Sequence, residues 1–332
     1  MKTYDLTSSA NPFGPSKKVR NALRKAIKKV NKGDEKERRL LKKYIAMKEG
    51  IKEDEVLFFS SLPLFLNFFC EAYSVSSIWV VLPLSRRLRG YLDAVKRLYG
   101  ERLRIRPLEI TSPTSVDTNP EDLFFITYPH DVLGLSANPH IERILRYAKD
   151  KGIKVIVDET LQEFSGTPTK LPEILRIDDS FLLRNLSDIY GLGGLPFFCA
   201  FAKASTIERM EPYLSLDEIP YLTYNAIRVA MKDKRFKERK RVLLNEEKAY
   251  VMEKAKKLKE LLVEDGGCNF VLLKSPYFSG DVEKILRRRG FITEVFTGEK
   301  GESYLRFPLK KRKVNAQFIK TVAALIEELK NQ

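Results

Sequence analysis

Short apolar runs alternate with amphipathic helical segments over roughly the first two thirds of the chain. Several of these runs are almost continuously apolar, which is typical of strands buried on both faces of a mainly parallel sheet. An amphipathic segment at 141–151 lies between two of the runs, where a crossover helix belongs. We therefore predict an α/β domain with helices on both faces of the sheet. The predicted strands are 56–59, 78–82, 123–127, 155–158, 180–184 and 197–201.

The pattern changes after about residue 228. A long helix is predicted over 236–263, and strands and helices alternate from there to the closing helix at 316–329. This second pattern predicts a small α+β unit. We expect three parts in all: an N-terminal segment that packs with the small domain, a large domain with a mainly parallel central sheet, and a small C-terminal domain. Their predicted bounds are 1–30, 31–228 and 229–332.

The composition is that of a folded globular protein with a basic surface. The chain has 332 residues, 43% of them hydrophobic, and a formal net charge of +16. Basic residues mostly alternate with acidic ones on helical patterns, as in 232–241, so we interpret them as an ion-pair-rich surface typical of thermophilic proteins. No basic run is interleaved with aromatic residues, so nucleic-acid binding is not the function we expect. The excess charge still favours an anionic ligand or an acidic partner.

No feature of the sequence indicates a membrane or a secreted protein. No apolar run is long enough to span a bilayer, and residues 1–5 lack the apolar core of a signal peptide. Cys70, Cys199 and Cys268 are scattered without metal-binding spacing and are interpreted as buried thiols. We expect a cytoplasmic protein.

The segment 184–196, with the sequence RNLSDIYGLGGLP, carries the clearest chemical motif. It resembles the cofactor-lysine segment of the fold-type I aminotransferases that depend on pyridoxal phosphate (PLP), which reads R-T-x-S-K-x-Y-G-L-A-G-L-R. Asp188 stands at the position of the lysine that forms the Schiff base with PLP. A carboxylate cannot condense with an aldehyde, so the resemblance implies that no covalent cofactor link forms at this position.

Four other segments extend the resemblance along nearly the whole chain, in the order found in the histidinol-phosphate aminotransferase and threonine-phosphate decarboxylase branch of these enzymes. Residues 8–15 resemble the opening S-x-N-x-N-P-x-G-P, and 155–159 resemble the V-V-D-E end of a strand. Residues 269–271 and 304–306 resemble strand segments of the small domain. The resemblance implies an aminotransferase-type fold. It also implies a homodimer, because the family builds its sites across a subunit interface, or a heterodimer with an active relative.

The resemblance assigns roles to five positions. Asp158 matches the aspartate that pairs with the pyridine nitrogen of PLP, and Ser187 matches a residue that binds the cofactor phosphate. Asp131 stands where the family has an asparagine that touches the ring hydroxyl. Asn11 and Arg306 match residues near the substrate carboxylate, which an arginine grips through its planar fork.

Other positions depart from the family, and the departures concern the cofactor. The glycine of the phosphate loop is Ser61, and Pro63 removes a backbone N–H that such a loop uses. The stacking aromatic is Ser85, a tyrosine near the ring hydroxyl is Leu161, and the arginine that ends the lysine segment is Pro196. We therefore expect no tightly bound cofactor, with PLP as the cofactor if the protein is an active enzyme after all.

Two interpretations of the emptied pocket remain open. Asp131, Asp158 and Asp188 converge in the family fold, so they could share a divalent cation or an amine-bearing ligand. Alternatively, side chains such as Leu62 and Leu161 fill the pocket and the carboxylates turn outward; we prefer this second interpretation and expect no metal. For Arg306 a structural ion pair and a ligand clamp are equally favoured.

The sequence as a whole predicts a degenerate aminotransferase-like protein that acts as a binding, scaffold or partner protein. The alternative is an aminotransferase or decarboxylase of amino acids or amino-phosphates that binds PLP without a covalent link. A third alternative, a basic nucleic-acid-binding protein, rests on charge alone.

Overall fold

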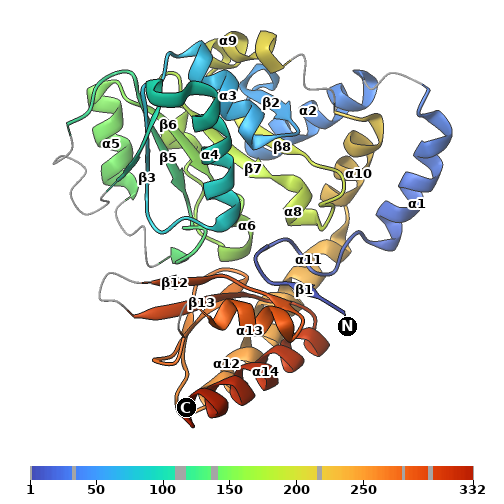
Figure 1. Ribbon diagram of the computed structural model, residues 1–332. Coiled ribbons are helices and arrows are strands. Elements are labelled where there is room, and N and C mark those ends of the chain that lie inside the picture. Colours follow the sequence, from blue (N-terminus) through green and yellow to red (C-terminus); the bar gives the residue numbers. More distant parts are fainter. Residues whose placement is uncertain are drawn as a thin grey trace.

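The computed structural model describes residues 2–31, 35–108, 117–135, 141–214, 219–278, 281–297 and 302–331. They form a larger α/β unit and a smaller α+β unit. Figure 1 draws the larger unit above the smaller one. No helix in these ranges is both long enough and apolar enough to cross a membrane.

The larger unit is built, in the described residues, on a seven-stranded sheet. Neighbouring strands from β7 through β4 run parallel, whereas β8 is antiparallel to both of its neighbours. Every residue of β5 is buried, as the continuous apolar pattern predicted. The mainly parallel central sheet is thus confirmed. In spatial order the strands are β2 (Val56–Phe59), β8 (Phe198–Phe201), β7 (Phe181–Asn185), β6 (Lys154–Asp158), β5 (Asp122–Thr127), β3 (Ser77–Val80) and β4 (Arg104–Pro107).

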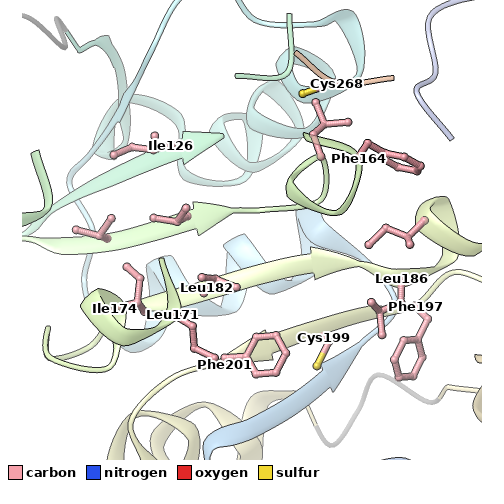
Figure 2. Packing of buried hydrophobic residues seen from close by; sticks show 14 of the residues in the cluster. Ile126, Phe164, Leu171, Ile174, Leu182, Leu186, Phe197, Cys199, Phe201 and Cys268 are labelled. Atoms are coloured by element: carbon pink, nitrogen blue, oxygen red, sulfur yellow. The ribbon is translucent and has the colours of Figure 1, made fainter. Parts of the chain in front are cut away.

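Helices cover both faces of this sheet, because alternate residues of each strand enter two separate hydrophobic cores. Figure 2 shows part of the first core, in which Ile126, Leu182 and Phe201 lie on three different strands. In the second core the Phe59 and Phe65 rings stack with centroids 4.5 Å apart. Helices α1 (Lys17–Ala26), α2 (Glu35–Glu49), α5 (Ile141–Lys151) and α10 (Tyr221–Met231) contribute to the first core, and α3 (Leu62–Ala72), α4 (Arg86–Tyr99) and α9 (Ala204–Leu214) to the second.

The smaller unit is an antiparallel sheet backed by helices, with its own hydrophobic core. The N-terminal strand β1 (Tyr4–Asp5) pairs in parallel with β11 (Phe291–Ile292) of this unit. The sheet order is β12 (Val295–Thr297), β13 (Ser303–Pro308), β10 (Phe270–Lys274) and β9 (Leu262–Asp265). The helices are α11 (Lys234–Arg241), α12 (Lys248–Lys256), α13 (Val282–Arg288) and α14 (Arg312–Lys330), with a π-helical segment (Val242–Glu247) joining α11 to α12.

One predicted element differs from the structure. The helix predicted over 236–263 ends at Lys256, and its last residues form β9, an edge strand antiparallel to β10. Val263 is buried in this strand, whereas its neighbour Leu262 is exposed. Pairing with β10 provides hydrogen-bond partners for backbone groups of residues 262–265. This tertiary contact overrides the local helical pattern.

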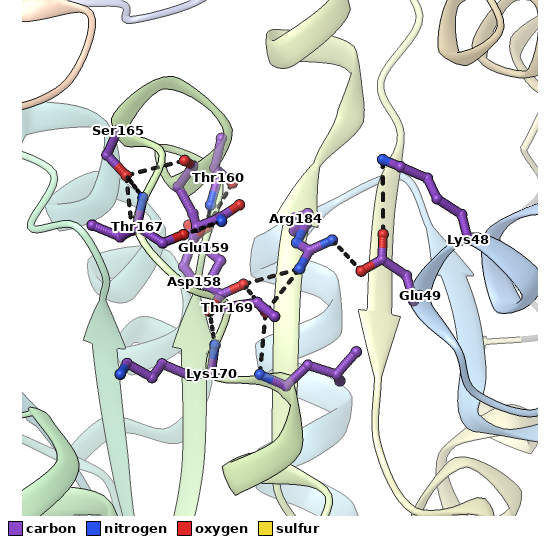
Figure 3. A network of polar contacts seen from close by, with 12 residues as sticks. Lys48, Glu49, Asp158, Glu159, Thr160, Ser165, Thr167, Thr169, Lys170 and Arg184 are labelled. Atoms are coloured by element: carbon purple, nitrogen blue, oxygen red, sulfur yellow. Dashed lines mark hydrogen bonds and ion pairs between the residues drawn. The ribbon is translucent and has the colours of Figure 1, made fainter.

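A buried arginine joins three segments of the larger unit (Figure 3). Arg184 of β7 pairs with Glu49 at the end of α2 at 2.9 Å and with Glu159, directly after β6, at 3.1 Å. It also donates to the Thr169 hydroxyl at 2.9 Å. Glu159 in turn accepts from the hydroxyl of Thr169 and the backbone amide of Lys170. The buried carboxylate of Glu159 is therefore paired and hydrogen-bonded, as a charge in this environment requires.

Replacing Arg184 should destabilise the fold strongly. The Arg184→Met variant leaves Glu159 buried without its cation, which costs about 3–5 kcal/mol. Denaturant unfolding measures this loss. The control is Arg209→Met, because Arg209 is 54% exposed and its pair with Asp179 is a surface pair worth less than about 1 kcal/mol. Equal losses in the two variants would contradict the role given to Arg184.

Candidate functional site

A cavity of about 100 Å³ lies at the carboxyl ends of β5, β6 and β7. The smaller unit and the N-terminal segment contribute to its wall, so residues far apart in the sequence meet there. Ligands of open α/β sheets bind outside the carboxyl ends of the strands, which makes this cavity the candidate site. The lining residues are Thr7, Ser8, Ser9, Leu62, Ser85, Arg87, Leu88, Tyr91, Thr127, Pro129, Asp131, Asp158, Thr160, Leu161, Asn185, Asp188, Phe198 and Arg306.

Strand register brings the predicted carboxylates to this cavity. Thr127 of β5 lies opposite Asp158 of β6, and Asp158 lies opposite Leu183 of β7. The three strands therefore end close to the same level, and the side chains that follow them share one edge of the sheet. Asp131 and Asp188 both line the cavity together with Asp158. Leu62 and Leu161, expected to fill the pocket, line it too, so the carboxylates and the leucines occupy it together.

Asp188 is held in an ion pair that the sequence did not predict. Its Oδ2 lies 2.6 Å from Nη1 of Arg87, which belongs to the first turn of α4. The Nε of Arg87 donates to the Tyr91 hydroxyl at 2.6 Å. In the sequence, Arg87 is one member of a basic run, and nothing local distinguishes it from its neighbours. Asp188 thus makes a specific electrostatic contact with Arg87.

Arg306 of β13 is a buried cation with few partners. Its side chain donates from Nη2 to the Ser9 hydroxyl, and its guanidinium carbon lies 4.3 Å from the centre of the Phe270 ring. Its Nε is buried without a hydrogen-bond partner, and it forms no ion pair with any residue in the described ranges. Burial lowers the pKa of Arg306, while Asp131 and Glu294 act in the opposite direction. The structural ion pair that was one of its two predicted roles is therefore not formed with described residues.

Asp131 also has an unused hydrogen-bonding position. Its Oδ2 accepts from the Ser85 amide at 3.3 Å, but its Oδ1 is buried without a partner. His130 Nδ1 lies 3.7 Å from Oδ1, yet this nitrogen already accepts two backbone amides at 3.1 and 3.2 Å. The ring proton is therefore on Nε2, which faces the Val81 carbonyl at 3.3 Å. Burial lowers the pKa of His130, so the ring stays neutral and does not pair with Asp131.

Asp158 is held by a local turn. Its Oδ1 accepts from the amide of Thr160 at 2.8 Å and from the Thr160 hydroxyl at 2.5 Å. Burial raises the pKa of Asp158 to about 6, and the two bonds from Thr160 act against this rise. The carboxyl group therefore changes charge close to neutral pH, at the floor of the cavity.

Ser187 and Asn11 do not line the cavity. The Ser187 hydroxyl donates to Asn185 at 2.7 Å and accepts from the Phe197 amide at 3.1 Å. The Asn11 side chain accepts from Phe13 and donates to the carbonyl of Ile189. Both residues therefore hold the backbone around α8 (Leu186–Tyr190), and neither reaches a ligand in this geometry.

The residues present do not fit covalently bound PLP. The side chains that line the cavity include no lysine among the described residues. The segment that matches the phosphate loop begins α3, where Ser61 is the N-cap and accepts from the Leu64 amide, and Pro63 lies in the first turn. Asp158 fits the role that the resemblance implies for it, since it reaches the cavity and can accept a hydrogen bond from a pyridinium ring.

The described residues do not provide a set of ligands for the divalent cation considered in the sequence analysis. Within the described ranges, no three His, Cys, Asp or Glu side chains lie close enough together to hold one metal ion. The carboxylates of Asp131, Asp158 and Asp188 line one cavity, but Asp188 is engaged by Arg87 and Asp158 by Thr160.

The charge of Asp158 should limit stability near neutral pH. The folded protein keeps this proton up to about pH 6, whereas an unfolded aspartate loses it near pH 4, so ionisation lowers the free energy of unfolding between these values. Asp158→Asn keeps both acceptor bonds without the charge. We expect this variant to be more stable than the wild type at pH 7 by up to about 3 kcal/mol and equally stable at pH 4. Denaturant unfolding across this range tests it. The exposed Asp93→Asn is the control, and a pH-independent difference for Asp158→Asn would refute the assignment.

Comparison with known proteins identifies the fold. No family model matches the chain. Histidinol-phosphate aminotransferase 2 of Archaeoglobus fulgidus is 24% identical over 323 residues, which cover 97% of this chain and 92% of that protein. The histidinol-phosphate aminotransferase of Sinorhizobium meliloti, solved in complex with pyridoxal-5'-phosphate, superposes with a TM-score of 0.82 at 14% identity, covering 99% of this chain and 92% of that one. The L-threonine-O-3-phosphate decarboxylase of Porphyromonas gingivalis gives 0.76 at 16% identity, with 97% and 99% covered.

These similarities favour the enzyme alternative over a cofactor-free binding protein, and they do not support the expectation that no cofactor binds. The chain has the fold of the PLP-dependent aminotransferases and decarboxylases, and its relatives and structural neighbours are histidinol-phosphate aminotransferases and threonine-phosphate decarboxylases.

Proposed function

We propose that the cavity binds an amino acid through its carboxylate and that Arg306 is the residue that takes this carboxylate. One observation carries the proposal: Arg306 is only 4% exposed, lines the cavity, and has an Nε without a partner. A buried guanidinium without a carboxylate is costly, and its planar fork matches a carboxylate with two parallel hydrogen bonds. A ligand carboxylate supplies the missing counter-charge.

In the first candidate function the bound amino acid is a substrate. The protein is then an aminotransferase or decarboxylase that holds PLP without a covalent link. The names of the relatives and the position of Asp158 in the cavity favour it. When bound, PLP supplies an electron sink for chemistry at the amino-acid α-carbon. In this candidate Asp158 would hold the ring nitrogen through a hydrogen bond and Arg306 would orient the substrate, while Asp188 would form no Schiff base.

The second candidate is a binding or partner protein without transaminase activity. The Asp188–Arg87 pair at 2.6 Å favours it, because this contact takes the place of the catalytic lysine. This candidate includes a dimer, formed either by two copies of this chain or by this chain and an active relative. Sedimentation velocity measures the mass of the assembly and tests it. Both candidates share the carboxylate site at Arg306.

A PLP titration separates the two candidates. The enzyme candidate predicts a saturable visible absorbance band and a higher melting temperature, with no cofactor trapped by borohydride, since Asp188 forms no imine. An unchanged spectrum and an unchanged melting temperature would exclude the enzyme candidate and support the binding-protein candidate. Trapped cofactor would contradict the non-covalent assignment. Lys310, whose pKa burial lowers to about 8 and which interacts with the charges of Asp188 and Arg306, is the first lysine to map by mass spectrometry.

Removing the guanidinium tests the carboxylate site itself. Arg306→Gln should weaken amino-acid binding, measured by calorimetry, by about 10–100-fold, because a charge-assisted hydrogen bond contributes about 1.5–3 kcal/mol. We expect no loss of thermal stability, since the arginine lacks an ion-pair partner among the described residues. Arg288→Gln, an exposed change on α13, is the control. Unchanged affinity in Arg306→Gln would refute the proposal.

A further inference from the structure

The ion pair between Asp188 and Arg87 leaves hydrogen-bonding capacity on the Asp188 carboxylate. A carboxylate accepts at about four lone-pair positions, but the contact with Arg87 joins only Oδ2 to Nη1. No other described side chain donates to Asp188. The Asp188 side chain is 16% exposed, and it lines the cavity that Arg306 also lines. A ligand in the cavity can therefore reach Oδ1 without breaking the ion pair.

The backbone of Asp188 is fixed by three contacts, which gives its carboxylate a defined place. Its amide donates to the Asn185 side chain at 3.0 Å, and its carbonyl accepts from the Asn11 amide at 2.9 Å and the Gly191 amide at 3.3 Å. The residues on either side of Asp188 are both buried. The Asn11 and Ser187 side chains, which the family resemblance assigned to ligands, thus serve to hold this segment.

Arg87 positions the Asp188 side chain. Its own orientation is fixed by the bond from Nε to the Tyr91 hydroxyl and by the Tyr91 ring, 5.5 Å from the guanidinium carbon. A charge-assisted contact of 2.6 Å between the guanidinium and Oδ2 holds the carboxylate in one orientation. The arrangement presents a fixed negative charge to the cavity, with one oxygen paired and the other available.

Resting on the proposed function, we propose that Asp188 accepts the α-ammonium group of the amino acid whose carboxylate Arg306 holds. The cavity then recognises the zwitterion of a small amino acid by two opposite charges. The ammonium contact itself requires neither a covalent bond nor a cofactor. Asp131, whose Oδ1 lacks a partner, lines the same cavity and adds negative potential to it.

The charges of the lining are compatible with this ligand class. Arg87 and Arg306 face Asp131, Asp158 and Asp188, so the five groups sum to −1 above about pH 6 and to zero when Asp158 holds its proton. A zwitterion adds no net charge to this set. A 2-hydroxy acid of the same shape adds a net negative charge to this set and leaves the free oxygen of Asp188 without a charged donor.

The test compares amino acids with their hydroxy-acid counterparts. Calorimetry with the standard L-amino acids identifies those that bind the wild-type chain, and each is then compared with its hydroxy acid, for example L-alanine with L-lactate. We expect the amino acid to bind about 10–100-fold more tightly than the hydroxy acid. The affinity for the amino acid should fall above about pH 9, where its ammonium loses the proton, whereas the affinity for the hydroxy acid should not.

Variants separate the role of Asp188 from a structural one. Asp188→Asn should reduce the preference for the amino acid to less than about threefold, because the neutral amide lacks the charge that strengthens the ammonium contact. Arg87→Gln should weaken amino-acid binding while keeping part of the preference. Asp93→Asn and Arg97→Gln, exposed on the same helix α4, repeat the chemical changes outside the cavity and should change neither affinity. Thermal melting of each variant verifies the fold.

The outcomes distinguish this inference from the proposed function. If an amino acid and its hydroxy acid bind equally and both depend on Arg306, the carboxylate site stands and the role of Asp188 is wrong. If the preference survives in Asp188→Asn, the ammonium is bound elsewhere and the inference also fails. If no amino acid binds the wild-type chain, the proposed function fails and the inference falls with it.

Discussion

The parallel pairing of β5, β6 and β7 is the constraint on which the candidate site depends. Backbone hydrogen bonds set the register, so that Thr127, Asp158 and Leu183 lie side by side. Because the strands are parallel and buried on both faces, their carboxyl ends meet at one edge and the chain after each strand must turn there. Polar side chains in these turns are consequently gathered into one cavity, whatever chemistry they carry.

Two buried arginines differ in whether their charge is paired within the fold. Arg184 forms ion pairs with two carboxylates, so its charge is balanced. Arg306 has a hydroxyl and an aromatic ring as partners but no ion pair with a described residue, and the Nε of both arginines is buried without a hydrogen-bond partner. In a low-dielectric interior a paired charge stabilises the fold, whereas an unpaired one has affinity for an external counter-charge, which is the role we propose for Arg306.

The backbone of the segment around Asp188 is held by contacts that do not use the Asp188 side chain. The turn through α8 is held by Asn185, Ser187 and the left-handed Gly191, where a Cβ would come within 2.8 Å of Gly14. These contacts do not involve the side chain of residue 188, so lysine and aspartate suit the same backbone. The Asp188 carboxylate, held by Arg87, is the part of this segment that faces the cavity.

The amino-acid sequence by itself determined the fold class and much of the position of the site. Continuous apolar runs such as 123–127 are sufficient to predict buried parallel strands, and the motif at 184–196 marks Asp188 because its neighbours match a known turn. The conversion of residues 262–265 from predicted helix to β9 depended on pairing with β10, which local periodicity does not report. Likewise, the sequence does not distinguish Arg87 from the other arginines of its basic run or Ser9 from other loop serines; the fold brings Arg87 to Asp188 and Ser9 to Arg306. Local patterns are set by neighbours in the chain, whereas partners for charges are set by distance in space, and only the tertiary structure decides the latter.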